Sequence, residues 1–252
     1  MPEDDNRRFS GVRRLYGEAG FQKLCAAHVC VVGIGGVGSW CVEALARTAV
    51  GRLTLIDLDM VAESNTNRQI HALDGIYGKA KVDAMAERIA QINPSCQVDC
   101  IEDFVTADNL EPTLGRGFDV VIDAIDQARV KTAMIDFCRR KGQSLIVVGA
   151  AGGQTDPTQV CFSDLSQTIQ DPLLAKVRAS LRREHGFPRQ GKFGVPAVYS
   201  TEPLRYPQAQ GECEVRPTAT GLNCAGFGSS VCVTSVFGMT AASRAIEFIC
   251  GR

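Results

Sequence analysis

The chain has 252 residues, of which 45% are hydrophobic, and a formal net charge of −1 at pH 7. This length and composition suit one large α/β domain, or a core with an appendage, and the balanced charge indicates nothing for or against nucleic acid binding. The 11 cysteines include no Cys-x-x-Cys pair, which argues against a four-cysteine zinc site.

We expect neither a targeting segment nor a membrane-spanning segment in this chain. Residues 1–14 are charged and lack an apolar stretch, and many cysteines lie inside apolar runs, so we expect a cytoplasmic protein. The uncharged stretch from Leu222 to Ser243 is long enough to span a bilayer. Its glycine, serine, threonine and alanine content instead favours a glycine-rich loop followed by a C-terminal helix packed on a core, so we expect no membrane partner.

The first expected βαβ unit follows a polar, arginine-rich arm from Asp4 to Gly20. An apolar run at 29–32 is typical of a strand buried on both faces, and a G-x-G-x-x-G turn with a helical pattern follows at once. A second strand, 53–56, ends on Asp57, about 20 residues beyond the turn. Glycines let phosphate approach backbone N–H groups, and a helix N-terminus attracts anions. The unit therefore predicts a nucleotide site, with either a dinucleotide or ATP as the ligand.

Strands and helices continue to alternate as far as residue 153. A polar segment, 60–78, is too hydrophilic for a core, and a helix runs from Lys79 to Asn93-Pro94. Further strands are expected at 97–101, 120–123 and 145–148, with a helix between the last two. This alternation predicts an α/β fold with a doubly wound, Rossmann-like, mostly parallel sheet.

The pattern changes after residue 153. A strand is expected at 160–162, and Asp171-Pro172 starts a basic helix. The segment 186–219 is expected to be a loop. Six cations stand between 176 and 192 against one acid, Glu184; they are Lys176, Arg178, Arg182, Arg183, Arg189 and Lys192. The run is either a solvated helix and surface loop or a contact for an RNA phosphate backbone, and the segment does not decide.

Polar side chains gather where the parallel strands end, which is the edge at which open α/β sheets bind ligands. Two cations and a carboxylate there are more than a pyrophosphate bridge needs. They fit ATP with Mg²⁺, in which Arg68 and Lys81 offset phosphate charge and Asp126 holds the metal. An alternative interpretation makes Arg68–Asp126 and Lys81–Asp123 structural ion pairs.

These motifs together resemble the ubiquitin-activating, ThiF/MoeB-like adenylating superfamily over residues 8 to 150. The motifs are the glycine turn, Asp57-Leu58-Asp59, Ser64 to Gln69, Lys81 and Asp123-x-x-Asp126. The resemblance implies ATP on the first βαβ half, Asp57 on the ribose, and a substrate carboxylate that attacks the α-phosphate. The expected nucleotide-binding residues are Gly33, Gly35, Gly36, Gly38, Asp57, Asp59, Asn65, Arg68, Gln69, Lys81 and Asp123.

Longer stretches are similar to one branch of this superfamily, the tRNA threonylcarbamoyladenosine dehydratases. They are Arg14 to Gly17, Asn65 to Leu73, Asp123 to Asp126, Ala151 to Gln159, Thr168 to Leu173 and Cys224 to Gly228. The branch implies a tRNA carrying threonylcarbamoyladenosine as substrate, with ATP activating its carboxylate and its own ureido group closing a ring. Such an intramolecular nucleophile needs no enzyme thiol; Cys213 and Cys224 are the candidates if one acts. A sulfur-transfer protein is a further candidate partner.

The superfamily's N-terminal arm carries an arginine that enters the partner subunit's site, which implies a homodimer. Gly11 aligns with that position here, so Arg14 and Arg8 are the nearest substitutes, and Arg14 joins Arg68, Lys81 and Asp126 as a catalytic candidate. We expect residues 1–153 to form the ATP-binding adenylation core with this arm. Residues 154–252 are expected to form a substrate-facing extension, with the C-terminal helix packed on the core.

Two other functions stay open. A ubiquitin-like or sulfur-carrier-protein adenylyltransferase would use the same site, but the missing Cys-x-x-Cys pairs count against it. An NAD-dependent oxidoreductase or an NAD-sensing module would explain the glycine turn and Asp57 alone. It would leave Arg68, Lys81 and Asp126 without a role.

Overall fold

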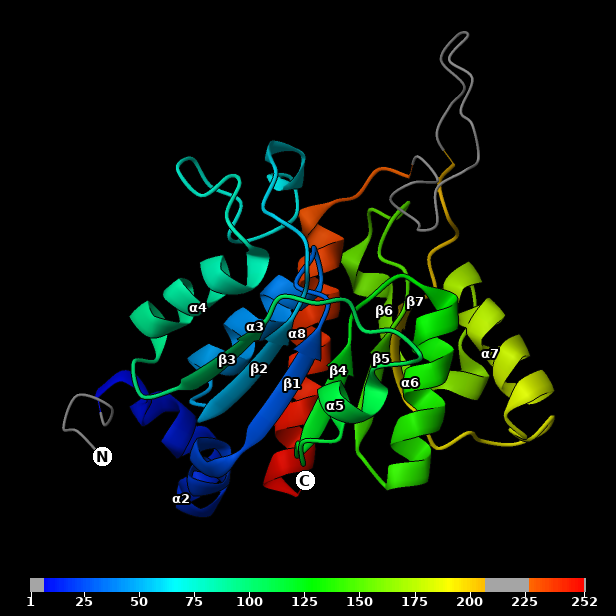
Figure 1. The fold of residues 1–252 in the computed structure, drawn as a ribbon, viewed down its shortest axis with the longest axis horizontal. Helices are drawn as coiled ribbons and strands as arrows, with labels where there is room; N and C mark the ends of the chain where they lie inside the picture. Colours follow the sequence, from blue (N-terminus) through cyan, green and yellow to red (C-terminus); the bar gives the residue numbers. More distant parts are fainter. Residues whose placement is uncertain (1–6, 207–226, 252) are drawn as a thin grey trace, which may run out of the picture.

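The computed structural model describes residues 7–206 and 227–251, in which seven strands form one sheet in the order β3-β2-β1-β4-β5-β7-β6 (Figure 1). All neighbouring strands are parallel except β6, which is antiparallel to β7. The strands are β1 (His28–Val32), β2 (Arg52–Ile56), β3 (Gln97–Ile101), β4 (Val120–Asp123), β5 (Leu145–Val148), β6 (Val160–Asp164) and β7 (Pro196–Ser200). The predicted doubly wound, mostly parallel sheet is confirmed.

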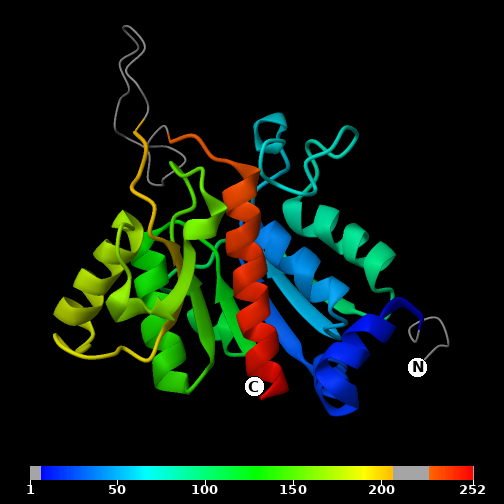
Figure 2. The ribbon, with the colours of Figure 1, turned by 180° about the vertical axis from the view of Figure 1, so that it is seen from behind.

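Helices cover both faces of the sheet (Figures 1 and 2). They are α2 (Ser10–Ala26), α3 (Gly38–Arg47), α4 (Lys81–Ile92), α5 (Leu110–Leu114), α6 (Ala128–Lys141), α7 (Pro172–Glu184) and α8 (Val231–Cys250). Three short 3₁₀ helices are Glu63–Asn65, Pro157–Gln159 and Leu165–Gln167.

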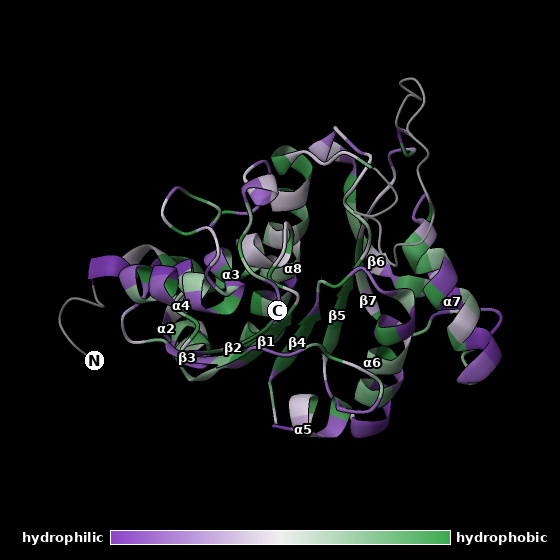
Figure 3. Ribbon diagram, turned by 45° about the horizontal axis from the view of Figure 1, so that its top comes forward, coloured by the Kyte–Doolittle hydropathy of each residue, from purple (hydrophilic) through white to green (hydrophobic). Residues whose placement is uncertain are grey.

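Alternate residues of the central strand enter different cores, as a strand buried on both faces requires. Val29 and Val31 pack in one cluster with α3, α4 and α8, whereas Cys30 and Val32 pack in a second with α5, α6 and α7. In Figure 3 the central strands are green and the outer ends of α2 and α7 are purple, in agreement with this layering.

The C-terminal helix α8 packs closely against α3. A Cβ at Gly238 would lie 2.4 Å from the carbonyl oxygen of Val37, so only glycine allows this crossing. Phe237, Ala241 and Ala245 on the same helix are fully buried. Among residues 7–206 and 227–251, no helix is long and apolar enough to cross a membrane.

One expectation about the second half is wrong. The segment 186–219 is not all loop, because β7 runs through it and pairs with both β5 and β6. Residues placed in the expected extension therefore complete the same sheet as the nucleotide half. The short helix α5 was also not predicted.

Candidate nucleotide-binding and catalytic site

The glycine turn lies between the carboxyl ends of β1, β2 and β4. Val32 pairs with Ile56 on one side and with Asp123 on the other. Gly33 has a φ of +88°, and a Cβ at Gly38 would lie 1.8 Å from the carbonyl oxygen of Gly33. The turn therefore requires glycine at both positions, and it leads directly into the N-terminus of α3.

Asp57 holds this turn in place. Its Oδ2 accepts a hydrogen bond from the Ile34 N–H at 2.6 Å, and its Oδ1 accepts one from the Asp59 N–H at 2.8 Å. Burial raises the pKa of Asp57, and the positive charge of Lys81 opposes that rise. The predicted ribose acid thus also positions the backbone expected to meet phosphate.

Lys81 lies beside the two aspartates that follow β2. It is 5% exposed, with Nζ 2.7 Å from Asp59 Oδ2 and 4.0 Å from Asp57 Oδ1. The alternative Lys81–Asp123 pair is therefore not formed. The side chain of Asp59, the nearest acid to Lys81, is 57% exposed and faces solvent.

The polar segment after β2 is more buried than its composition suggests, which corrects the expectation that it stays outside the core. Asn65, Gln69 and His71 are 8%, 5% and 3% exposed. Asn65 Oδ1 accepts from the Ala62 N–H at 3.0 Å, and its carbonyl oxygen accepts from the N–H groups of Arg68 and Gln69. Asn65 therefore organises a compact turn rather than a solvated loop.

Two side chains in this turn lack hydrogen-bond partners among the described residues. They are Gln69, at its Oε1, and His71, at both ring nitrogens. Burial, together with the charges of Lys81 and Arg88, lowers the pKa of His71 to about 4, so its imidazole is neutral.

Arg68 lies over the glycine turn. Its side-chain carbons are 3.1 Å from the position a Cβ would take at Gly36. One terminal nitrogen donates to the Ser64 carbonyl oxygen and to Asn67 Oδ1, each at 2.8 Å. The alternative Arg68–Asp126 pair is absent within the part of the chain that the structure describes.

The two aspartates after β4 have different environments. Asp123 and Lys131 are both 0% exposed, and Lys131 Nζ donates to Asp123 Oδ1 at 2.7 Å. Asp123 Oδ1 also accepts from the Ile125 N–H, so Asp123 braces its loop from inside. Asp126 is half-buried, and its carboxylate makes no hydrogen bond or ion pair with any described residue. Of the two, Asp126 is the one free to meet a ligand.

Sequence reasoning missed Lys131. A signal was available, since Lys131 lies in helical register with Met134, Ile135 and Cys138 on the buried face of α6. A lysine on an apolar stripe indicates a buried partner, and that partner is Asp123.

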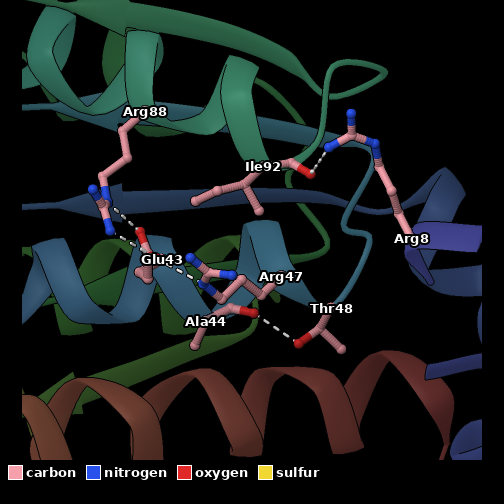
Figure 4. A network of polar contacts seen from close by, with 7 residues as sticks. All are labelled: Arg8, Glu43, Ala44, Arg47, Thr48, Arg88 and Ile92. Carbon is pink, nitrogen blue, oxygen red and sulfur yellow. Dashed lines mark hydrogen bonds and ion pairs between the residues drawn. The ribbon is translucent and has the colours of Figure 1, made fainter. Parts of the chain in front are cut away.

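Glu43 ties α3 to α4, the two helices that start at the site (Figure 4). It is 3% exposed and accepts from Arg88 Nε at 2.6 Å and from Arg47 Nε at 2.7 Å. The glycine turn and Lys81 are thereby held by one packed pair of helices.

Among the residues that the structure describes, one predicted candidate lies away from this site. Arg14 is exposed on α2, which precedes β1 at the amino edge of the sheet, opposite the glycine turn (Figure 1). Cys213 and Cys224 lie outside the described residues.

A glycine turn, a carboxylate directly after β2 and two cations at the carboxyl edge of a doubly wound sheet are the features of a nucleotide-phosphate-binding α/β protein. The ThiF family model matches residues 9–252, and the chain belongs to this family. The resemblance predicted from the motifs is confirmed.

The chain is also similar to named relatives along nearly its whole length. It is 52% identical over 248 residues to the tRNA threonylcarbamoyladenosine dehydratase of Escherichia coli (strain K12), covering 96% of this chain and 92% of the relative. The Haemophilus influenzae dehydratase is 49% identical, with 98% and 95% covered. The crystal structure of the E. coli enzyme in complex with ATP matches with a TM-score of 0.90 at 48% identity, covering 100% of this chain and 97% of that one.

Proposed function

We propose that this protein is an ATP-dependent enzyme that dehydrates threonylcarbamoyladenosine in tRNA to a cyclic form. The observation that carries the proposal is the 52% identity, over nearly the whole of both chains, to an enzyme named for this reaction. The ATP and AMP complexes of that enzyme, each with a TM-score of 0.90 to this chain, support ATP as the co-substrate.

The residues at the carboxyl edge receive roles from their positions. Asp57 holds the ribose, and the N–H groups around the glycine turn and the N-terminus of α3 face the phosphates. Lys81 and Arg68, with Asn65 and Gln69, offset or hydrogen-bond phosphate oxygens. Asp123 does not contact the nucleotide. It supports the site through its buried ion pair with Lys131.

A magnesium ion fits the donor set. Mg²⁺ usually takes one or two carboxylates together with substrate phosphates and water, and Asp126 offers a half-buried carboxylate with no described partner. When bound, the ion would neutralise part of the triphosphate charge.

The reaction needs no group beyond the substrate itself to close the ring. A carboxylate oxygen attacks the α-phosphorus, pyrophosphate leaves, and an acyl adenylate results. The ureido group then attacks the acyl carbon and AMP departs. The elements of water that the substrate loses end up in AMP and pyrophosphate. Burial raises the pKa of the Cys30 and Cys41 thiols far above neutrality, which leaves these two without nucleophilic thiolate.

A homodimer is part of the proposal. Because α2 lies at the amino edge, an arm arginine such as Arg14 reaches a glycine-turn site only in another subunit (Figure 1). Residues 154–252 would select the tRNA. A sulfur-transfer partner rests on the family resemblance alone, whereas a cytoplasmic location rests on the charged N-terminal segment and on the cysteines that lie inside apolar runs.

Nucleoside analysis of tRNA tests the function in cells. Cells lacking this chain should accumulate open threonylcarbamoyladenosine and lose the cyclic form, and the wild-type chain, but not Lys81→Ala, should restore it. An unchanged nucleoside pattern would contradict the proposal.

A further inference from the structure

Two aromatic side chains contact each other where the two described parts of the chain meet, and one of them is open to solvent. Tyr206 is 73% exposed, more than any other large hydrophobic side chain of residues 7–206 and 227–251. Its ring centroid lies 5.3 Å from that of Phe227, with the planes tilted by 53°. Phe227 is half-buried, so the pair presents mainly the ring of Tyr206 to a partner.

The pair is built on the loop that follows β5. The Gly153 N–H donates to the Gly228 carbonyl oxygen, and the Arg205 N–H donates to the Gly153 carbonyl oxygen, both at 2.8 Å. Gly153 has a φ of +74°, and a Cβ there would lie 2.9 Å from Phe227 Cδ1. Both aromatic residues are therefore anchored at the carboxyl edge of the sheet, where the nucleotide site also lies.

A chain of polar contacts joins the aromatic pair to the candidate phosphate site. Ser229 forms a bridge with Gly152, and its carbonyl oxygen accepts from Asn67 Nδ2 at 3.1 Å. Asn67 Oδ1 in turn accepts from Arg68. Figures 1 and 2 show this lead-in to α8 crossing the carboxyl edge between the segment after β2 and the end of β7.

A cation stands beside the pair. Arg205 keeps 69% of its side chain exposed while its Nε lies 3.4 Å from Glu202 Oε1. Glu202 is buried and accepts from the N–H groups of Thr155 and Asp156 at 2.9 and 2.8 Å. The ion pair at Nε thus holds the guanidinium of Arg205 in place, while most of the side chain stays exposed to solvent.

We propose that Tyr206 and Phe227, with Arg205, form a stacking platform for an unpaired tRNA base that neighbours the modified adenosine. The inference rests on the proposed function. A base that enters an active site must leave its stack, so its neighbour loses a stacking surface that an exposed aromatic ring can replace. An adjacent arginine suits the phosphate that follows such a base.

The test is the affinity for a fluorescently labelled anticodon stem-loop that carries threonylcarbamoyladenosine, measured by anisotropy without ATP. Tyr206→Ala should weaken binding by roughly 10- to 100-fold, the range for losing one stacked base, and Tyr206→Phe should bind like wild type. Phe248→Ala is the matched control, because Phe248 is a 57% exposed aromatic in the last turn of α8, at the opposite edge of the sheet. Tyr206→Ala should leave the salt dependence unchanged, whereas Arg205→Gln should reduce its slope by about one.

The contradicting outcomes are separable. Unchanged RNA affinity in Tyr206→Ala, with normal pyrophosphate release by the wild type, overturns the platform alone. Loss of affinity that accompanies a change in oligomeric state by sedimentation velocity also overturns it, since the pair would then face a second copy. A wild-type chain that releases no pyrophosphate with this RNA overturns the proposed function instead.

Discussion

Lys81 is a buried cation whose closest counter-charge, Asp59, is mostly exposed. The positive charge of Lys81 would therefore stabilise a triphosphate bound at the glycine turn. Lys81→Ala and Arg68→Ala should each slow adenylation by about 10²–10³-fold, the scale for removing one preorganised stabilising group. Substrate-dependent pyrophosphate release is the measurement, and Lys79→Ala, which breaks only a surface pair with Glu87, is the control. Equal rates in Lys81→Ala and Lys79→Ala would remove Lys81 from the site.

His71 makes the fold sensitive to acid. Its folded pKa of about 4 lies below the ordinary 6.5, so the unfolded chain binds more protons between these values. Its contribution is therefore present above pH 6.5 and is lost as the pH falls toward 4, by about 2–3 kcal/mol. Urea unfolding of wild type and His71→Leu between pH 4.5 and 7.5 should show a flatter profile for the variant. Parallel profiles would mean that His71 does not titrate as described.

Single residues show how far sequence reasoning reached into the site. The predicted set at Asp57, Arg68 and Lys81 meets around the glycine turn because all three come after β2, which ends beside β1 at the edge where the turn begins. Which cation pairs with which acid was not predictable, since the Lys131–Asp123 pair depends on how α6 packs against β4. Helical spacing places Lys131 on the buried face, but it does not name the acid opposite.

At the scale of elements, the bounds of three strands were predictable to the residue, and those of β1 and β2 to within one residue. The bounds 97–101, 120–123 and 145–148 agree with β3, β4 and β5. β7 was missed because its apolar core, Ala197 to Tyr199, stands in a proline-containing segment. Only pairing with β5 and β6, distant in sequence, makes it a strand.

The basic residues of α7 and of the segment after it provide a prediction for the substrate. Lys176 and Arg183 on α7, and Arg189 and Lys192 in the segment that follows it, are exposed, whereas the guanidinium of Arg178 is partly buried and hydrogen-bonded to Thr168. Replacing these four exposed cations by glutamine should weaken tRNA binding regardless of sequence and flatten its salt dependence. ATP affinity should stay unchanged, because α7 lies away from the glycine turn. Filter binding across a salt series measures the effect, and an unaltered slope would exclude phosphate contacts by this basic segment.

At the scale of the whole molecule, the arm and the site lie at opposite edges of one sheet (Figure 1). An arm-truncated chain and an Arg68→Ala chain should each be inactive alone. Mixed, they should regain part of the activity, because one subunit of a mixed dimer keeps an intact site and receives an intact arm. A fully active monomer by sedimentation velocity would exclude this arrangement.

The central claim is that the activated carboxylate belongs to threonylcarbamoyladenosine in tRNA. Pyrophosphate release from ATP should be compared with tRNA bearing this nucleoside, the same tRNA lacking it, and a ubiquitin-like sulfur carrier. We expect release with the modified tRNA only. Release with the carrier alone would contradict the dehydratase function and favour a protein adenylyltransferase that uses the same site.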